Sequence, residues 1–211
     1  MKQTYVQFTA GRGPVECAAA CYVISRKFVD EILKINLVPI VVDYEFDDEF
    51  GYRSIIFKID KATDKEIDAI DVIRSKWEGT IKFISTKNSF RPNHKRKNWF
   101  VGCNFFEVDD TKITFDMNDI KIELMRSSGP GGQNVNKVES GVRLTHIPTG
   151  ITVKCTMSRD QKQNLKVAKE IMQAKLDSLN NAKEANIKNL FWLSHDSLER
   201  GGEIMTIKGE I

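Results

Sequence analysis

Twelve residues near the middle of the chain combine a glycine-rich stretch, which has little side-chain bulk, with a glutamine amide. Residues 126–137 read Arg-Ser-Ser-Gly-Pro-Gly-Gly-Gln-Asn-Val-Asn-Lys. Glycine permits backbone angles that a Cβ forbids and lets other groups approach the main chain closely, while Pro130 stiffens the segment and removes one donor. The segment can therefore present backbone N–H groups and the Gln133 amide to a reacting centre, with Arg126 and Lys137 suited to phosphate contacts.

Two alternating apolar segments flank these residues and predict how they are held. Residues 120–125 precede the glycines and residues 142–147 follow them, and alternation of this kind is typical of half-buried strands. We therefore expect a loop held at both ends by strands. Taken alone, Gly-Gly-Gln is equally compatible with a plain surface loop.

Composition limits the classes of protein to which the chain can belong. Its 211 residues are 41% hydrophobic and 29% charged, with a net charge of +3, which is ordinary for a globular protein of one or two domains. No apolar run has the length of a membrane span, and the N-terminus lacks a signal-peptide pattern. The sequence predicts a cytoplasmic protein without a membrane anchor.

Cysteines and histidines give little support for metal or nucleophilic chemistry. Cys17 and Cys21 lie four residues apart and could supply two ligands, but no histidine or second cysteine pair is near them in sequence. We expect packed free thiols, no metal and no cofactor. The three histidines suggest no triad with serine or cysteine; they are His94, His146 and His195.

The first half of the chain predicts a sheet with helices on it, which is an α+β pattern. A helix is expected from Pro14 to about Leu33, with Gly13 as its cap, and a second helix over 63–75 opens on a capping box, Thr63 to Glu66. The expected strands are 5–9, 39–45, 52–59, 77–85 and 99–106.

A basic loop joins the last two of these strands. Five of the thirteen residues 86–98 are Lys or Arg, and Phe90 and Trp99 flank the basic run, where aromatic rings could stack on bases. A solvated charge run is the alternative, but we favour RNA contact. The predicted RNA contacts are Ser89, Phe90, Arg91, His94, Lys95, Arg96, Lys97 and Trp99.

The second half begins with an acidic stretch, in which we place a domain boundary near Asp116. After the glycine-rich loop, a tight turn is expected at 147–150 and a long helix from Asp160. Its apolar stripe is separate from a basic face. Farther on, Phe191, Trp192, Leu193 and Leu198 suggest a packed helix, and 204–207 a strand. The stripe is Leu165, Ala168, Met172, Leu176 and Leu179; the basic face is Arg159, Lys162, Lys166 and Lys169.

The segment around the glycines resembles the catalytic domain of bacterial class I peptide release factors. The likeness covers about 40 residues at fixed spacing: Arg-Ser-Ser-Gly-x-Gly-Gly-Gln-x-Val-Asn-Lys from Arg126, Ser-Gly-Val-Arg-Leu-Thr-His-Ile-Pro-Thr-Gly from Ser140, and Ser-Arg-x-Gln from Ser158. The resemblance implies hydrolysis of the ester that joins a peptide to tRNA, in the large ribosomal subunit. Peptidyl-tRNA and the RNA of both ribosomal subunits are then the partners.

The resemblance also assigns roles to residues. Gly131, Gly132 and Gln133 become catalytic: the Gln133 backbone N–H stabilises the oxyanion, and its side chain orients water. Gln133 also becomes a candidate for N5-methylation, with a glutamine methyltransferase as a further partner. The expected contacts with large-subunit RNA are Arg126, Ser127, Asn134, Asn136, Lys137, Arg159, Lys162 and Lys166.

Two departures from ordinary release factors point to a smaller branch, the release factor H type. The 86–98 loop lacks the usual codon-reading tripeptide, and the N-terminal helical domain of ordinary members has no counterpart. Arg91-Pro-x-His-Lys-Arg-Lys-Asn-Trp-Phe and Leu198-Glu-Arg-Gly match the branch. The branch implies rescue of ribosomes damaged in the decoding centre, together with an RNA repair ligase. A stop-codon-dependent termination factor and a non-catalytic RNA-binding regulator stay open as alternatives.

The resulting expectation is a monomer with two domains and a release-factor-like α+β fold. Residues 1–115, completed by 181–211, form a decoding-side domain of sheet and helices. Residues 116–180 form the domain that carries Gly131-Gly132-Gln133 and hydrolyses peptidyl-tRNA.

Overall fold

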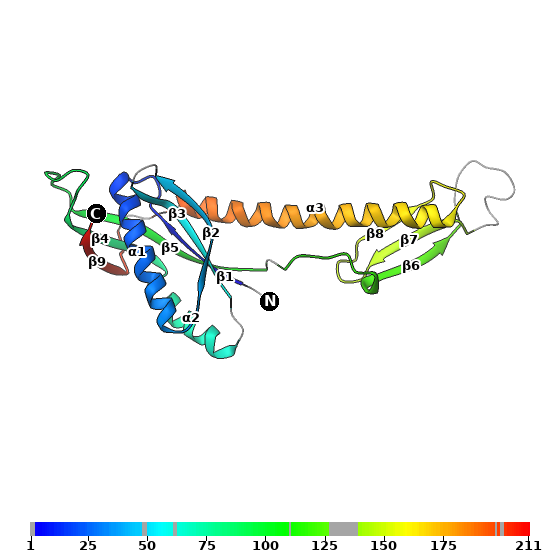
Figure 1. The fold of residues 1–211 in the computed structure, drawn as a ribbon, viewed down its shortest axis with the longest axis horizontal. Helices are drawn as coiled ribbons and strands as arrows, with labels where there is room; N and C mark the ends of the chain where they lie inside the picture. The colour runs from blue at the N-terminus through cyan, green and yellow to red at the C-terminus, as the bar shows by residue number, and fades with distance from the viewer. Residues whose placement is uncertain are drawn as a thin grey trace. The chain divides into compact units, whose positions relative to one another are not determined.

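The computed structural model describes residues 3–47, 50–60, 63–109, 111–126, 139–196, 198 and 201–211, and Figure 1 shows their helices and strands. The chain divides into two compact units, residues 1–111 with 186–211 and residues 112–185. One sheet has six strands in the order β2-β3-β1-β5-β4-β9, and the other has three in the order β6-β7-β8. The predicted α+β fold class is confirmed.

The larger sheet belongs to the first unit. Four antiparallel pairings join β2 to β3, β3 to β1, β1 to β5 and β5 to β4, and β9 pairs parallel to β4. All the strands predicted for this part of the chain, including the one expected at 204–207, are present. Their bounds are β1 Gln3–Thr9, β2 Pro39–Asp47, β3 Gly51–Ile59, β4 Gly79–Lys87, β5 Asn98–Val108 and β9 Met205–Glu210.

Helix α1, Val15–Lys34, packs against this sheet as predicted. The expected cap was wrong: Pro14, with extended angles, is the N-cap, because a proline without an N–H fits the start of a helix. The helix approaches β3 closely at Gly51, whose φ is +132° and where a Cβ would lie 2.5 Å from the Ala18 carbonyl oxygen. Burial raises the pKa of the Cys21 thiol on this helix, which keeps it an inert packed group.

Helix α2, Asp64–Trp77, begins with the predicted capping box. The Thr63 hydroxyl accepts from the Glu66 backbone N–H, and the Glu66 carboxylate accepts from the Thr63 N–H. Trp77 was predicted to open a strand, and that was wrong: it is the last residue of α2. Its ring is buried, and the helix ends after it, where the Glu78 N–H donates to the Arg74 carbonyl and Gly79, with φ +136°, starts β4.

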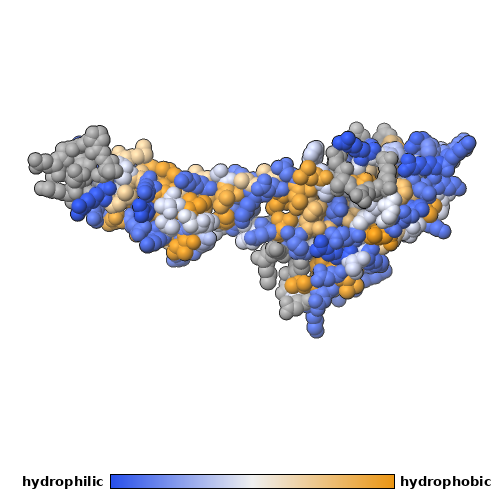
Figure 2. Space-filling view, turned by 180° about the vertical axis from the view of Figure 1, so that it is seen from behind, coloured by the Kyte–Doolittle hydropathy of each residue, from blue (hydrophilic) through white to orange (hydrophobic). Residues whose placement is uncertain are grey.

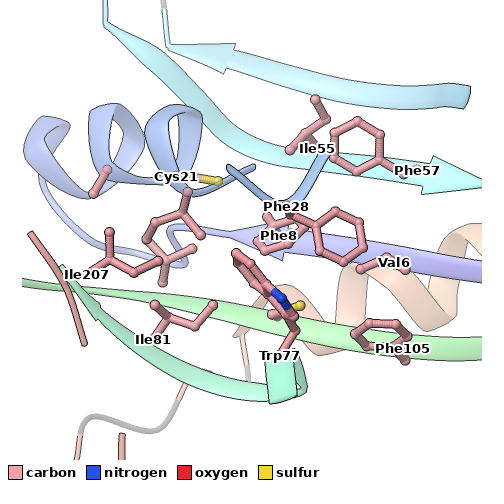
Figure 3. Packing of buried hydrophobic residues seen from close by; sticks show 14 of the residues in the cluster. Val6, Phe8, Cys21, Phe28, Ile55, Phe57, Trp77, Ile81, Phe105 and Ile207 are labelled. Atoms are coloured by element: carbon pink, nitrogen blue, oxygen red, sulfur yellow. The ribbon is translucent and has the colours of Figure 1, made fainter. Parts of the chain in front are cut away.

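An aromatic cluster forms the centre of the core between this sheet and its two helices. The ring centroids of Phe8 and Phe28 are 5.0 Å apart, and those of Phe28 and Trp77 are 5.3 Å apart. Figure 3 shows Phe57 and Phe105 beside them, with strands and helix contributing together. Large rings of this kind dominate the energy of apolar burial.

The second unit packs a three-stranded sheet against the first part of a long helix. Val142, Leu144, Ala168, Met172 and Leu176 are buried together, and Leu165 packs against them. The predicted apolar stripe of the helix is therefore confirmed from Leu165 to Leu176, whereas Leu179 is outside this cluster. The bounds of its elements are η1 Met117–Asp119, β6 Ile120–Met125, β7 Gly141–His146, β8 Thr152–Cys155 and α3 Gln161–Asp196.

The last turns of α3 belong to the first unit and cover the other face of its sheet. Phe191 is buried with Tyr5 and Ile56. Trp192 and Leu193 were expected to pack as well, but they are 66% and 62% exposed, because only one side of the helix faces the sheet.

Figure 2 shows hydrophobic residues interrupting the hydrophilic surface in several places.

In the part of the chain that the structure describes, every helix is too short or too polar to span a bilayer.

Candidate functional site

The predicted catalytic loop leaves and rejoins the sheet at a strand pair. Strands β6 and β7 are antiparallel, and their last pair is Met125 with Gly141. A Cβ on Gly141 would lie 2.9 Å from the Met125 carbonyl oxygen, so glycine lets the two strand ends approach. The predicted strands on both sides of the loop are therefore confirmed, and Arg126 is exposed directly after β6. The predicted residues Ser127, Gly131, Gly132, Gln133, Asn134, Asn136 and Lys137 lie outside the described residues.

The returning end of this loop is attached to α3 by a buried amide that the sequence analysis missed. Asn164 is fully buried; its Nδ2 donates to the carbonyl oxygens of Ser140 and Ser158, both at 2.8 Å, and its Oδ1 accepts from the Ser158 N–H at 2.8 Å. Gln161 Nε2 also donates to the Glu139 carbonyl at 3.3 Å. A signal was available, because Asn164 lies four residues before Ala168 on the apolar stripe, where an unexplained amide needs partners.

Replacing Asn164 with alanine is expected to lower the free energy of unfolding by about 2–3 kcal/mol. The change removes the hydrogen bonds that Asn164 makes to the backbone of Ser140 and Ser158, and losing the partner of a buried polar group costs about 1–3 kcal/mol. Urea unfolding followed by circular dichroism measures the effect. The matched control is Gln163→Ala, an exposed neighbour on the same helix; equal losses in both variants would contradict the anchoring role.

The predicted basic residues beside α3 lie at the surface. Arg159, Lys162 and Lys166 are exposed. Asp160 directly precedes α3, and its Oδ1 accepts from the Lys162 N–H at 3.0 Å, as N-terminal capping requires. The three cations are therefore available to an anionic partner.

The second predicted site, the basic loop between β4 and β5, opens with a turn made by Asn88. Its Oδ1 accepts from the N–H groups of Phe90 and Arg91, both at 3.0 Å, which is the Asx-turn that asparagine favours. The Phe90 ring packs edge-on against Phe50, with centroids 4.5 Å apart. Ser89 is exposed, and its N–H donates to the Ile211 carbonyl at 2.7 Å.

A buried carboxylate on α1 binds this loop. The Glu16 side chain has no exposed surface, and Arg91 meets it with two hydrogen bonds of 2.5 Å, from Nε to Oε1 and from Nη2 to Oε2. Burial raises the pKa of the Glu16 carboxyl, but hydrogen bonds from Arg91, from its own backbone N–H and from Asn88 outweigh burial, so the pKa lies below the ordinary value of a glutamate. Arg91, predicted to contact RNA, therefore has a structural partner within the protein.

The remaining basic residues differ in their surroundings. Lys95 and Lys97 are exposed, whereas the Arg96 guanidinium lies 4.9 Å from the centre of the Trp99 ring and donates through Nε to the Asn98 carbonyl at 2.9 Å. His94 is half-buried, and its Nδ1 accepts from the Arg96 N–H at 3.1 Å.

Trp99 was predicted to stack on RNA bases, and that prediction was wrong. Its side chain is 1% exposed. In β5 the residues Trp99, Val101, Cys103 and Phe105 alternate toward the core, as strand geometry dictates. The Trp99 ring instead packs against the Arg96 guanidinium.

Metal chemistry gains no support from the described ranges, in which no cluster of three or more His, Cys, Asp or Glu side chains could hold an ion.

Comparisons with known proteins agree with the resemblance that the loop residues suggested. The RF-1 domain family matches residues 109–199. The peptide chain release factor homolog of Escherichia coli is 33% identical over 209 residues, which cover 97% of this chain and 96% of that protein. Among solved structures, RF2 of Thermus thermophilus matches with 26% identity and a TM-score of 0.47, covering 98% of this chain and 57% of that one.

Ordinary release factors match over smaller shares of their length. Peptide chain release factor 2 of Frankia casuarinae is 32% identical over 87% of this chain, but the match covers 49% of that protein. Peptide chain release factor 1 of Nautilia profundicola is 52% identical over 38% of this chain and 23% of that protein. Because the Escherichia coli homolog is matched over nearly its whole length at 33% identity, the chain belongs to the peptide chain release factor family.

Proposed function

We propose that this protein hydrolyses the ester of peptidyl-tRNA on the ribosome and so releases the nascent peptide. The observation that carries the proposal is the pairing of Met125 with Gly141, which ties both ends of a glycine-rich segment to one hairpin. In the reaction, water attacks the ester carbonyl carbon and the bond to the tRNA ribose oxygen breaks. The peptide leaves as an acid, and a proton ends on the ribose hydroxyl.

The chain's own contribution to this reaction is positioning and electrostatic stabilisation. Gln133 donates its backbone N–H to the developing oxyanion and orients water with its amide, while Gly131 and Gly132 let the backbone approach. Arg126 and the exposed cations beside α3 contact phosphates of the large-subunit RNA. This second group consists of Arg159, Lys162 and Lys166.

The decoding-side unit directs this activity to ribosomes whose decoding centre is damaged. The basic loop supports this part of the proposal. Its Arg91 binds Glu16 and its Arg96 packs against Trp99, whereas Lys95 and Lys97 are exposed. Exposed cations on a braced loop suit a phosphate backbone, because phosphate contacts supply most of the affinity for RNA. An RNA repair ligase that rejoins the cut RNA, a glutamine methyltransferase that acts on Gln133, and a cytoplasmic site of action complete the proposal.

A single-turnover release assay tests this function. Peptidyl-tRNA is bound to intact ribosomes and to ribosomes cleaved in the decoding centre, each with and without a stop codon, and the released peptide is counted. Rescue predicts fast release on cleaved ribosomes whether or not a stop codon is present. Release only at stop codons on intact ribosomes would identify a termination factor, and no release on either would leave an RNA-binding regulator.

The exposed lysines of the loop are expected to carry part of the salt dependence of ribosome binding. Replacing both Lys95 and Lys97 with alanine removes two phosphate contacts, and each contact contributes about 0.7–0.9 to the slope of log affinity against log salt. The slope should therefore fall by about 1.5. Lys65→Ala, an exposed lysine on α2, is the control; an unchanged slope in the double variant refutes the RNA role of the loop.

A further inference from the structure

Strand β2 leaves an apolar surface open at one edge of the six-stranded sheet. It is the outermost strand, paired only to β3 in the sheet as described, and nearly all of its residues are exposed. Tyr44 is 61% exposed and Phe46 is 51% exposed. Exposed apolar edges are a liability that proteins usually cover or charge, so this one calls for a partner.

The aromatic residues of this edge form a continuous ridge. Tyr52 lies between the others: its ring centroid is 5.9 Å from that of Tyr44, 5.5 Å from that of Phe46 and 5.6 Å from that of Tyr22. Tyr22 stands on α1 and is 38% exposed. Contiguous rings of this kind are typical of the anchoring centre of a protein interface.

Strand β2 itself carries acidic and no basic side chains. Its residues 39–47 contain Asp43, Glu45 and Asp47, of which Asp47 pairs with Arg53, whereas residues 86–98 contain five Lys or Arg and no acid. Asp43 and Glu45 also line an open groove of about 550 Å³ between this edge and the last turns of α3. Among the described residues that line it, Lys188 is the one Lys or Arg, against these two carboxylates, and Trp192 exposes its ring there. Carboxylates beside an exposed indole suit a Lys or Arg side chain.

We propose that the β2 edge docks an extended protein segment in which apolar residues alternate with Lys or Arg. Apolar side chains of that segment cover the aromatic ridge, and its basic side chains enter the groove beside Asp43 and Glu45. The proposal rests on the proposed function in placing this segment on the ribosome. It adds a protein contact to the RNA contacts of the basic loop.

Charge favours a basic protein segment over two other partners, which are RNA and a second copy of the chain. Phosphates would be repelled by the acidic edge, and a second copy of the chain would bring acidic edge against acidic edge, which costs affinity. Register shifts at Val41–Asp43 and Glu45–Phe46 also interrupt the ladder with β3. A bulged edge is a poor template for a long added strand, so recognition is expected to run through side chains.

Reversing the edge charge gives the sharpest test, because the two kinds of ribosomal partner predict opposite signs. Asp43→Lys with Glu45→Lys should weaken binding to purified ribosomes by about tenfold or more if a basic protein segment is bound, since close charge pairs couple strongly across interfaces. The same variant should bind more tightly if the edge faces RNA. Tighter or unchanged binding overturns the proposal.

Crosslinking identifies what covers the ridge. Benzoylphenylalanine at position 44 is irradiated with purified ribosomes, and the product is treated with nuclease or protease. A nuclease-resistant product whose peptide is rich in Lys and Arg is expected. A crosslink to RNA, or a dimer of the chain in light scattering, overturns the proposal. The control position is Val72, which is 67% exposed on α2.

Failure of this inference can be separated from failure of the proposed function. The release assay on the wild-type chain reports the function, and the edge variants report the docking surface. If the wild type fails to bind ribosomes, a fluorescent peptide of alternating Arg and Val residues is titrated directly, with an alternating Glu and Val peptide as control. Tighter binding of the Arg peptide, lost in the Lys variant, supports the surface; equal binding of both overturns it.

Discussion

Replacing Gln133 with proline is expected to lower the single-turnover rate constant of peptide release by about 10²–10³-fold. Proline has no backbone N–H, so the variant loses the donor that we propose stabilises the oxyanion. The ribosome affinity should stay close to that of the wild type, because the cations that we propose contact RNA are unchanged. Release kinetics at saturating protein measure the first quantity, and filter binding measures the second.

The alanine variant at the same position separates the main chain from the side chain. Gln133→Ala keeps the N–H and removes only the amide that we propose orients water, so its rate constant should lie between those of the wild type and of the proline variant. If the proline variant released peptide at the wild-type rate, the backbone donor would have no part in the reaction.

Replacing Arg91 with alanine is expected to lower the free energy of unfolding by about 3 kcal/mol. Removing one partner of a buried ion pair leaves an uncompensated charge, which costs about 3–5 kcal/mol; the lower end applies because Arg91 itself is 46% exposed while Glu16 is fully buried. Urea unfolding at pH 7 measures the loss. Adding Glu16→Gln should restore much of it, since a neutral amide is cheaper to bury.

The pH dependence of this loss has a defined sign. The pKa of Glu16 is lowered in the folded wild type, so its contribution to stability is fully present above about pH 4.5 and declines as the pH falls through the folded pKa. In Arg91→Ala, burial is expected to raise the pKa, and protonation then relieves the cost. The stability gap between the two proteins should therefore narrow between pH 7 and pH 4; a widening gap would contradict the ion-pair explanation.

Local patterns were sufficient to predict most elements of this fold. The alternation in residues 52–59 predicts β3, and the Thr63–Glu66 capping box predicts the start of α2. Both signals depend on residues a few positions apart, where geometry fixes which side chains meet. The strands around the glycine-rich loop were recognisable for the same reason.

Contacts between distant segments could not be predicted in the same way. Arg91 looks like its basic neighbours, and only the folded chain brings it to Glu16, 75 positions away. Trp99 looked like a stacking residue, although its place in the β5 alternation should have indicated the core. Asn164 is an ordinary helix residue until Ser140 and Ser158 are seen around it.

Strand β9 pairs with β4, although the two strands are far apart in the sequence. Next to this pairing, Lys82 Nζ contacts Glu203 at 2.9 Å across 121 positions. During synthesis, every residue of the 112–185 unit leaves the ribosome before this sheet can receive its sixth strand. Until then, β4 exposes an unpaired edge next to the basic loop, and such edges invite misassembly. We therefore expect the unit of residues 112–185 to complete its folding first. The unit of residues 1–111 and 186–211 is then expected to depend on chaperones until β9 has been synthesised.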